Sequence, residues 1–251
     1  MNEEKFTGKA ALYKKFRPSY PQELLDYLYS ELNFSKHSTI ADIGAGTGIF
    51  TRLLLERGSK VYAIEPNDDM RETSKKDLSE YKNFVSVNTS AENTGLDEAS
   101  VDFITVAQAF HWFERQLFKQ ECQRLLKPGG KVVLVWNSKE SDSEIIRRND
   151  EIIEKYCVNT GGFKQRGGVP EDYKDFFAGG VCEYKVFRND MYYDNTGFIG
   201  KNLSSSYAPK EEAEPEKYNG YICELNELFE EYSENGIIHY PQITKSYTGH
   251  V

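Results

Sequence analysis

The stretch from Thr39 to Phe50 constrains the fold of this chain more than any other part of the sequence. A short apolar run carries one aspartate, Asp42, and is followed by glycines at alternate positions, Gly44, Gly46 and Gly48. Glycine allows positive φ and leaves room for a ligand to approach the main chain. The pattern therefore predicts a buried strand that ends in a tight turn and leads into a helix, with a ligand site at the turn.

Strand and helix patterns alternate from Thr39 to Asn137, which is typical of a parallel sheet with crossover helices. Strands are expected at 39–43, 60–64, 84–87, 101–106 and 131–136, with helices at 50–57, 68–80 and 114–126. Further along, a helix at 143–157, a strand at 183–190, a helix at 217–232 and a strand at 237–247 are expected. The last two strands would form an antiparallel pair at the sheet edge and complete seven strands.

The expected fold class is α/β: a Rossmann-like, mostly parallel sheet of seven strands with an antiparallel last strand, an N-terminal helical lid and a small cap insertion. We expect four regions. They are a lid at 1–38, interrupted near Pro18 and Pro21, a ligand-binding core at 39–137, a cap at 138–182 on the substrate side, and strands with a helix at 183–251 that complete the sheet.

Composition narrows the range of partners. The net charge of −9 argues against nucleic acid, whose phosphates require a basic surface. No apolar run approaches the ~20 residues that span a bilayer, and the acidic N-terminus does not resemble a secretory signal. The four cysteines and four histidines show no metal-ligand spacing. We therefore expect a cytoplasmic protein that binds small molecules and no metal; the sequence leaves its oligomeric state open.

The spacing of the glycines distinguishes between ligands. A dinucleotide fingerprint has a glycine three positions after its second one, and here Ile49 occupies that position. Glu65 ends the second strand, where a Rossmann-like site needs an acceptor for ribose hydroxyls. Asn67 and Met70 follow it and are placed to flank an adenine ring, although packing explains Met70 equally well.

Several motifs occur together in chain order. They are Asp42-x-Gly44-x-Gly46-x-Gly48, Glu65-Pro66-Asn67, Gln108-Ala-Phe-His111-Trp112-Phe113 and Leu126-Lys-Pro-Gly-Gly130. The set resembles the class I methyltransferases that use S-adenosylmethionine (AdoMet), and in particular their type-11 domain. The segment from Tyr13 through Arg17 to Pro21 resembles the N-terminal lid of small-molecule members related to trans-aconitate methyltransferase.

This resemblance implies roles for individual residues. The cofactor AdoMet, with S-adenosylhomocysteine as its product, would be bound by the following residues: Tyr13, Arg17, Asp42, Gly44, Ala45, Gly46, Gly48, Glu65, Asn67, Met70, Ala91, Glu92 and Gln108. Glu92 would accept from the adenine amine. Asp42 would lie near the methionine amino group or order the glycine turn. Arg17 would pair with a carboxylate of cofactor or substrate, or form a surface ion pair.

His111 and Trp112 follow the fourth strand, at the edge where open parallel sheets bind their ligands. An unperturbed imidazole titrates near pH 6.5, so His111 is the candidate general base. The alternative is that both residues only line the substrate pocket.

Three functions are compatible with this sequence. The first is AdoMet-dependent methyl transfer to a small-molecule acceptor. The second is AdoMet binding without transfer. The third, an NAD(P)-dependent oxidoreductase, is disfavoured by Ile49. The identity of the acceptor and the atom that is methylated cannot be read from the sequence.

Overall fold

The computed structural model describes residues 18–140, 142–157, 170–205 and 207–251. Its main sheet consists of β1 (Thr39–Ile43), β2 (Lys60–Ile64), β3 (Phe84–Val87), β4 (Val101–Ala107), β5 (Leu126–Lys139), β6 (Glu183–Arg188) and β9 (Gln242–Gly249). These strands lie in the order β3-β2-β1-β4-β5-β9-β6. β1 to β5 are parallel, and β9 is antiparallel to both β5 and β6. This arrangement confirms the expected fold class.

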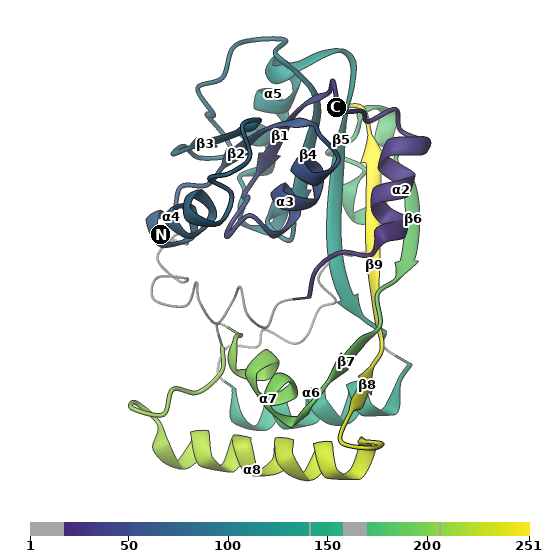
Figure 1. Cartoon of the computed structure of the whole chain (residues 1–251). Helices are drawn as coiled ribbons and strands as arrows, with labels where there is room; N and C mark the ends of the chain where they lie inside the picture. Colours follow the sequence, from purple (N-terminus) through teal and green to yellow (C-terminus); the bar gives the residue numbers. More distant parts are fainter. Residues whose placement is uncertain (1–17, 141, 158–169, 206) are drawn as a thin grey trace.

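Helices cover both faces of the sheet (Figure 1). On one face, α2 (Gln22–Ser30) and α3 (Ile49–Glu56) bury apolar residues in a shared core, which the end of α4 (Asp68–Asp77) joins through Leu78. On the other face, α5 (Arg115–Leu125) packs beside two short turns, η3 (Pro170–Tyr173) and η4 (Ala178–Gly180). The central strands are therefore buried on both sides, which explains their nearly continuous apolar sequence.

A smaller lobe, which we call the cap, lies beyond the carboxyl end of β5 (Figure 1). It contains α6 (Glu144–Tyr156), α7 (Asn195–Leu203), α8 (Pro215–Tyr232) and the antiparallel pair of β7 (Met191–Tyr193) and β8 (Ile238–Tyr240). The cap has a core of its own, in which Phe198, Tyr221 and Tyr240 are fully buried. Its elements come from two of the regions expected from the sequence: the cap region at 138–182 and the C-terminal region at 183–251.

The structure differs from the expected elements in several details, of which the following concern the longer elements. The strand expected at 237–247 is divided at Pro241 into β8 and β9, because proline has no N–H to continue a strand ladder. β5 extends to Lys139, where it still pairs with Gln242 of β9. α7 was not predicted, because Gly197 and Gly200 weaken its helical pattern. It begins where the side chain of its N-cap residue, Asp194, accepts a hydrogen bond from the Gly197 amide at 2.7 Å.

Within the described residues, no helix is long and apolar enough to cross a membrane. The same residues include no cluster of three or more histidine, cysteine or acidic side chains that could hold a metal ion.

Candidate functional site

The glycine turn joins β1 to α3 and has positive φ at all three glycines: 71° at Gly44, 57° at Gly46 and 82° at Gly48. At Gly44 a Cβ atom would lie 2.4 Å from Cβ of Ala109, so this glycine lets the turn pack against the end of β4. At Gly46 a Cβ atom would meet no atom of the described residues within 4 Å. Among these residues the backbone at Gly46 is therefore uncovered, in contrast to Gly44 and Gly48.

Glu65 connects the glycine turn to the loop after β2. Its Oε2 accepts a hydrogen bond from the Gly46 amide at 2.8 Å, and its Oε1 accepts one from the Asn67 amide at 2.9 Å. The amides of Gly44 and Ala45 donate to the carbonyl of Ile64, one residue before Glu65. The turn and the carboxylate are thus held side by side.

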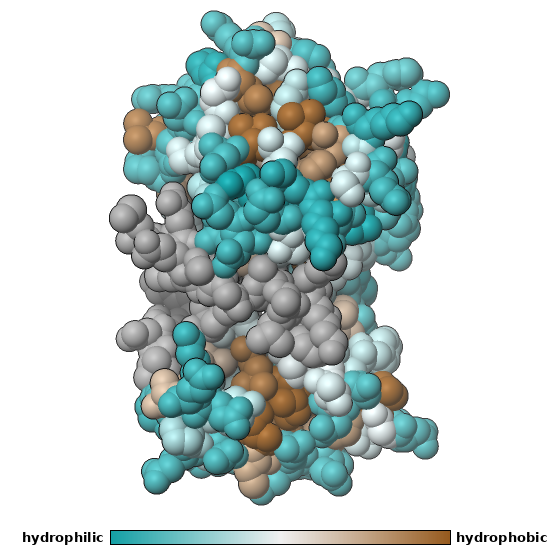
Figure 2. All heavy atoms as spheres, turned by 60° about the vertical axis from the view of Figure 1, so that its left-hand side comes forward, coloured by the Kyte–Doolittle hydropathy of each residue, from teal (hydrophilic) through white to brown (hydrophobic). Residues whose placement is uncertain are grey.

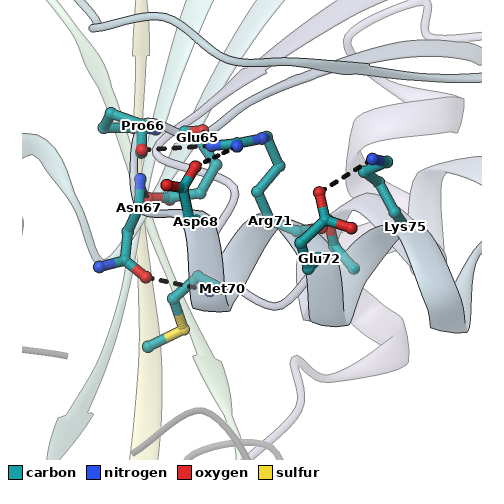
Figure 3. A network of polar contacts seen from close by, with 9 residues as sticks. Glu65, Pro66, Asn67, Asp68, Met70, Arg71, Glu72 and Lys75 are labelled. Atoms are coloured by element: carbon teal, nitrogen blue, oxygen red, sulfur yellow. Dashed lines mark hydrogen bonds and ion pairs between the residues drawn. The ribbon is translucent and has the colours of Figure 1, made fainter. Parts of the chain in front are cut away.

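Asn67 caps α4, because its Oδ1 accepts a hydrogen bond from the Met70 amide at 3.0 Å (Figure 3). Arg71 donates to the carbonyls of Glu65 and Pro66 and forms an ion pair with Asp68 (Figure 3). Asn67 and Met70 are both buried. This network fixes the backbone that presents the Glu65 carboxylate.

Asp42 lies beneath the glycine turn and is fully buried. Its carboxylate accepts hydrogen bonds from the hydroxyls of Thr51 at 2.5 Å and Thr105 at 2.8 Å, which ties β1 to α3 and β4. Burial raises the pKa of Asp42 to about 6, and the two hydroxyl donors oppose that rise. These contacts fit the role of ordering the turn.

Ala91 and Glu92 lie in the loop after β3. Ala91 is buried in the core beside the sheet. Oε1 of Glu92 accepts a hydrogen bond from the Glu114 amide at 2.9 Å, directly before α5. Glu92 thereby joins the loop after β3 to the segment that contains the next group of candidate residues.

Gln108 directly follows β4 and has φ of 63°, a left-handed conformation that is uncommon for a residue other than glycine. Its amide donates to the carbonyl of Val135 at 2.9 Å, and its side-chain Nε2 donates to the carbonyl of Asn137 at 3.2 Å. The side chain thus continues the β4–β5 ladder by one hydrogen bond after the strand itself has turned away.

His111 and Trp112 follow in the short turn η2 (Phe110–Trp112). His111 is exposed, Trp112 is half-buried, and their ring centroids lie 4.6 Å apart. A Cβ atom on Gly44 would approach the ring of Phe113 within 3.2 Å, so this segment adjoins the glycine turn. Tyr13 and Arg17 lie outside the described residues.

The structure thus gathers Gly44–Gly48, Glu65, Asn67 and the 108–113 segment at the carboxyl ends of β1, β2 and β4. Sequence reasoning missed two polar residues at this edge of the sheet. Asn137 follows the fifth predicted strand much as Glu65 follows the second, which is a usable signal. Lys245 is buried in β9 opposite Trp136, and burial lowers the pKa of its ammonium group; nothing in the sequence pattern marks it.

The chain is similar to known proteins in both sequence and fold. Residues 41–134 match the family model of a methyltransferase domain. An uncharacterized methyltransferase of Mycobacterium tuberculosis is 36% identical over 148 residues, which cover 59% of this chain and 58% of that protein. A provisionally named methyltransferase of Dictyostelium discoideum is 32% identical over 184 residues, covering 69% and 65%. The aligned part therefore spans about three fifths of the length of these curated relatives.

A solved structure from Anaeromyxobacter dehalogenans, provisionally described as a type II methyltransferase, superimposes with a TM-score of 0.68 at 21% identity. The match covers 94% of this chain and 98% of that one, so the likeness of fold includes the cap. The glycine turn, Glu65 and the 108–113 segment all lie within the matched residues. The chain therefore contains a methyltransferase domain of the class I, AdoMet-dependent type at residues 41–134.

Proposed function

We propose that this protein transfers the methyl group of AdoMet to a small-molecule acceptor and releases S-adenosylhomocysteine. The observation that carries the proposal is the pairing of Gly46, whose Cβ direction is open, with the Glu65 carboxylate that accepts from the Gly46 amide at 2.8 Å. Backbone that a ligand can approach therefore lies directly beside an acceptor of ribose hydroxyls.

The residues present fit this cofactor. Two backbone amides donate to the two oxygens of the Glu65 carboxylate, which fixes this acceptor beside the glycine turn. A carboxylate held at the end of the second strand suits hydrogen bonds from the hydroxyls of a ribose. Open space at Gly46 suits the approach of the nucleoside to the main chain.

AdoMet carries its methyl group on a positively charged sulfur, so the chain's own task is alignment of the acceptor and exclusion of water. His111 is exposed in the turn η2 that follows β4, and its ring lies tilted against that of Trp112. In this position it would take a proton from an acceptor that is protonated at working pH. Trp112 would form a wall of the acceptor pocket.

Three observations favour a small acceptor. The net charge of −9 disfavours a polyanion. The carboxyl ends of β1, β2 and β4 face the side where the cap lies (Figure 1). Figure 2 shows hydrophobic residues gathered on the part of the cap nearest the sheet lobe, where they would contact an acceptor with apolar groups.

The proposal includes a closer relationship to the methyltransferases that resemble trans-aconitate methyltransferase. It also includes the cofactor-binding roles of Tyr13 and Arg17. The four cysteines are free thiols, which fits a reducing, cytoplasmic setting.

Two measurements test the proposal. AdoMet and S-adenosylhomocysteine should raise the melting temperature, while NAD and NADP should not. Transfer of label from methyl-labelled AdoMet should then be screened against small carboxylic acids, phenols and amines. Stabilisation by NAD without stabilisation by AdoMet would refute the proposal. Binding of AdoMet with no transfer to any acceptor class would favour a binding protein without transferase activity.

A further inference from the structure

The side-chain amide of Asn137, at the carboxyl end of β5, uses both its donor and its acceptor. Its Oδ1 accepts hydrogen bonds from Thr244 Oγ1 at 2.6 Å and from Asn189 Nδ2 at 3.1 Å. Its Nδ2 donates to the carbonyl of Ser19 at 3.1 Å and lies 3.4 Å from that of Pro18. One amide thus joins β5, β9, the loop between β6 and β7, and the chain ahead of α2.

The Ser19 carbonyl receives a second donor, because Nδ2 of Asn189 also reaches it at 3.0 Å. Two side-chain amides, one from β5 and one from the loop after β6, therefore donate to one carbonyl oxygen, which has two lone pairs to offer. Next to it, the ring of Tyr20 packs edge-on against Phe50 with centroids 4.9 Å apart. Phe50 belongs to the first turn of α3, directly after the glycine turn. Residues 18–20 therefore extend from the end of β5 to the start of α3.

Asn137 also contacts the candidate site through its backbone carbonyl. The Asn137 carbonyl accepts the hydrogen bond from Nε2 of Gln108, which holds the left-handed end of β4. The amide of Asn189 donates to the carbonyl of Gln242 at 2.9 Å, where the chain passes between the cap and the sheet. A shift in the position of Asn137 would therefore move both the Gln108 side chain and residues 18–20.

We propose that Asn137 and Asn189 form an amide clasp that holds residues 18–20 across the carboxyl edge of the sheet and thereby positions the cofactor site. Both are positioning residues, because they act through Ser19 and Gln108. The clasp fixes the Ser19 carbonyl, close to the first described residue of the chain, at this edge. This inference rests on the proposed function in one respect only, namely that the positioned site binds AdoMet and S-adenosylhomocysteine.

The decisive variant is Asn137→Asp. A carboxylate keeps the acceptors used by Thr244 and Asn189 but loses both donors, and it places a negative charge against the Ser19 carbonyl. Asn189→Ala is the second variant, because it removes the other donor to Ser19. Thr244→Val is the matched control, since it removes a hydrogen bond to the same Oδ1 without touching residues 18–20.

The first readout is the dissociation constant of S-adenosylhomocysteine by titration calorimetry. We expect an increase of about tenfold for Asn137→Asp, corresponding to roughly 1.4 kcal/mol, a smaller increase for Asn189→Ala, and a change below twofold for Thr244→Val. The second readout is hydrogen exchange. Backbone amides at 19–24 should exchange faster in Asn137→Asp and Asn189→Ala but not in Thr244→Val, while those of β1 remain unchanged in all three.

Two results would overturn the clasp: unchanged exchange at 19–24 in both Asn variants, or equal weakening of binding in Thr244→Val and Asn137→Asp. If Asn137→Asp fails to fold, Asn189→Ala carries the test. Failure of the wild-type protein to bind AdoMet or S-adenosylhomocysteine would refute the proposed function instead, and the exchange measurement would still decide whether the clasp exists.

Discussion

A glycine at position 46 serves two purposes: it adopts a positive φ, and it leaves space beside the backbone for the cofactor. Replacement of Gly46 by alanine affects both, and their effects on stability and on binding can be measured separately. The φ of 57° at Gly46 is strained for any residue with a Cβ, and the cost is about 1–2 kcal/mol. No atom of residues 18–140, 142–157, 170–205 and 207–251 lies within 4 Å of the added methyl group, so no overlap with them adds to this cost. For a chain of this size the melting temperature should fall by roughly 2–8 °C. The same methyl group would enter the space where we place the cofactor, so the dissociation constant of S-adenosylhomocysteine should rise at least about tenfold.

Gly236 provides a matched control in the cap. It has φ of 74°, and its added Cβ would likewise meet no atom within 4 Å in the part of the chain that the structure describes. Gly236→Ala should therefore lose similar stability and bind the ligand as the wild type does. Gly44→Ala differs from both of these variants, because its methyl group would overlap a protein atom: it would lie 2.4 Å from Cβ of Ala109. Overpacking of about 1–3 kcal/mol should add to the strain, for a total loss of roughly 2–5 kcal/mol.

The assay combines thermal unfolding with titration calorimetry on the three alanine variants and the wild type. Equal ligand affinity in Gly46→Ala and Gly236→Ala, with both folded, would show that the space beside Gly46 is not the cofactor site. Equal stability of Gly44→Ala and Gly46→Ala would show that the contact between the turn and β4 does not constrain Gly44.

Three further predictions concern charged and titratable groups of the site. Glu65→Gln should weaken binding of S-adenosylhomocysteine by about 1.5–3 kcal/mol in calorimetry, because an amide donor would replace a carboxylate oxygen that faces a backbone N–H. Unchanged affinity would show that Glu65 does not bind the ribose. Burial raises the pKa of Asp42 to about 6, above its value near 3.9 in the unfolded chain, so the folded state binds the proton more tightly and its stability should fall as pH rises from 4 to 6, by up to roughly 2–3 kcal/mol. Asp42→Asn should abolish this slope in urea unfolding, and an identical slope in both proteins would contradict the assignment. His111→Ala should reduce turnover of the acceptor found in the screen by at least ~100-fold without changing cofactor affinity, whereas near-normal turnover would make His111 a wall residue.

The glycine turn and Glu65 were predictable because both are encoded locally. Alternate glycines after an apolar run indicate positive φ, and the acid that ends the second strand necessarily lies at the same sheet edge. Gln108 was expected at this edge, but its link to Asn137 was not, because that link depends on the register of β4 with β5. The cap was only partly predictable, since its core joins Ile145 and Tyr240, which lie far apart in sequence. Tyr13 and Arg17 stay predictions.

The position of β9 in the sheet has a consequence for the order in which the chain folds. β9 is the last strand in sequence, yet it lies between β5 and β6 and pairs with both. β6 is complete some fifty residues earlier, but its sheet partner does not exist until β9 has been synthesised. Contacts of such long range form slowly, because loop closure must precede them. In pulse-labelled hydrogen exchange during refolding, β6 and β9 should therefore gain protection together and after β1, β2 and β4; earlier protection of β6 alone would contradict this order.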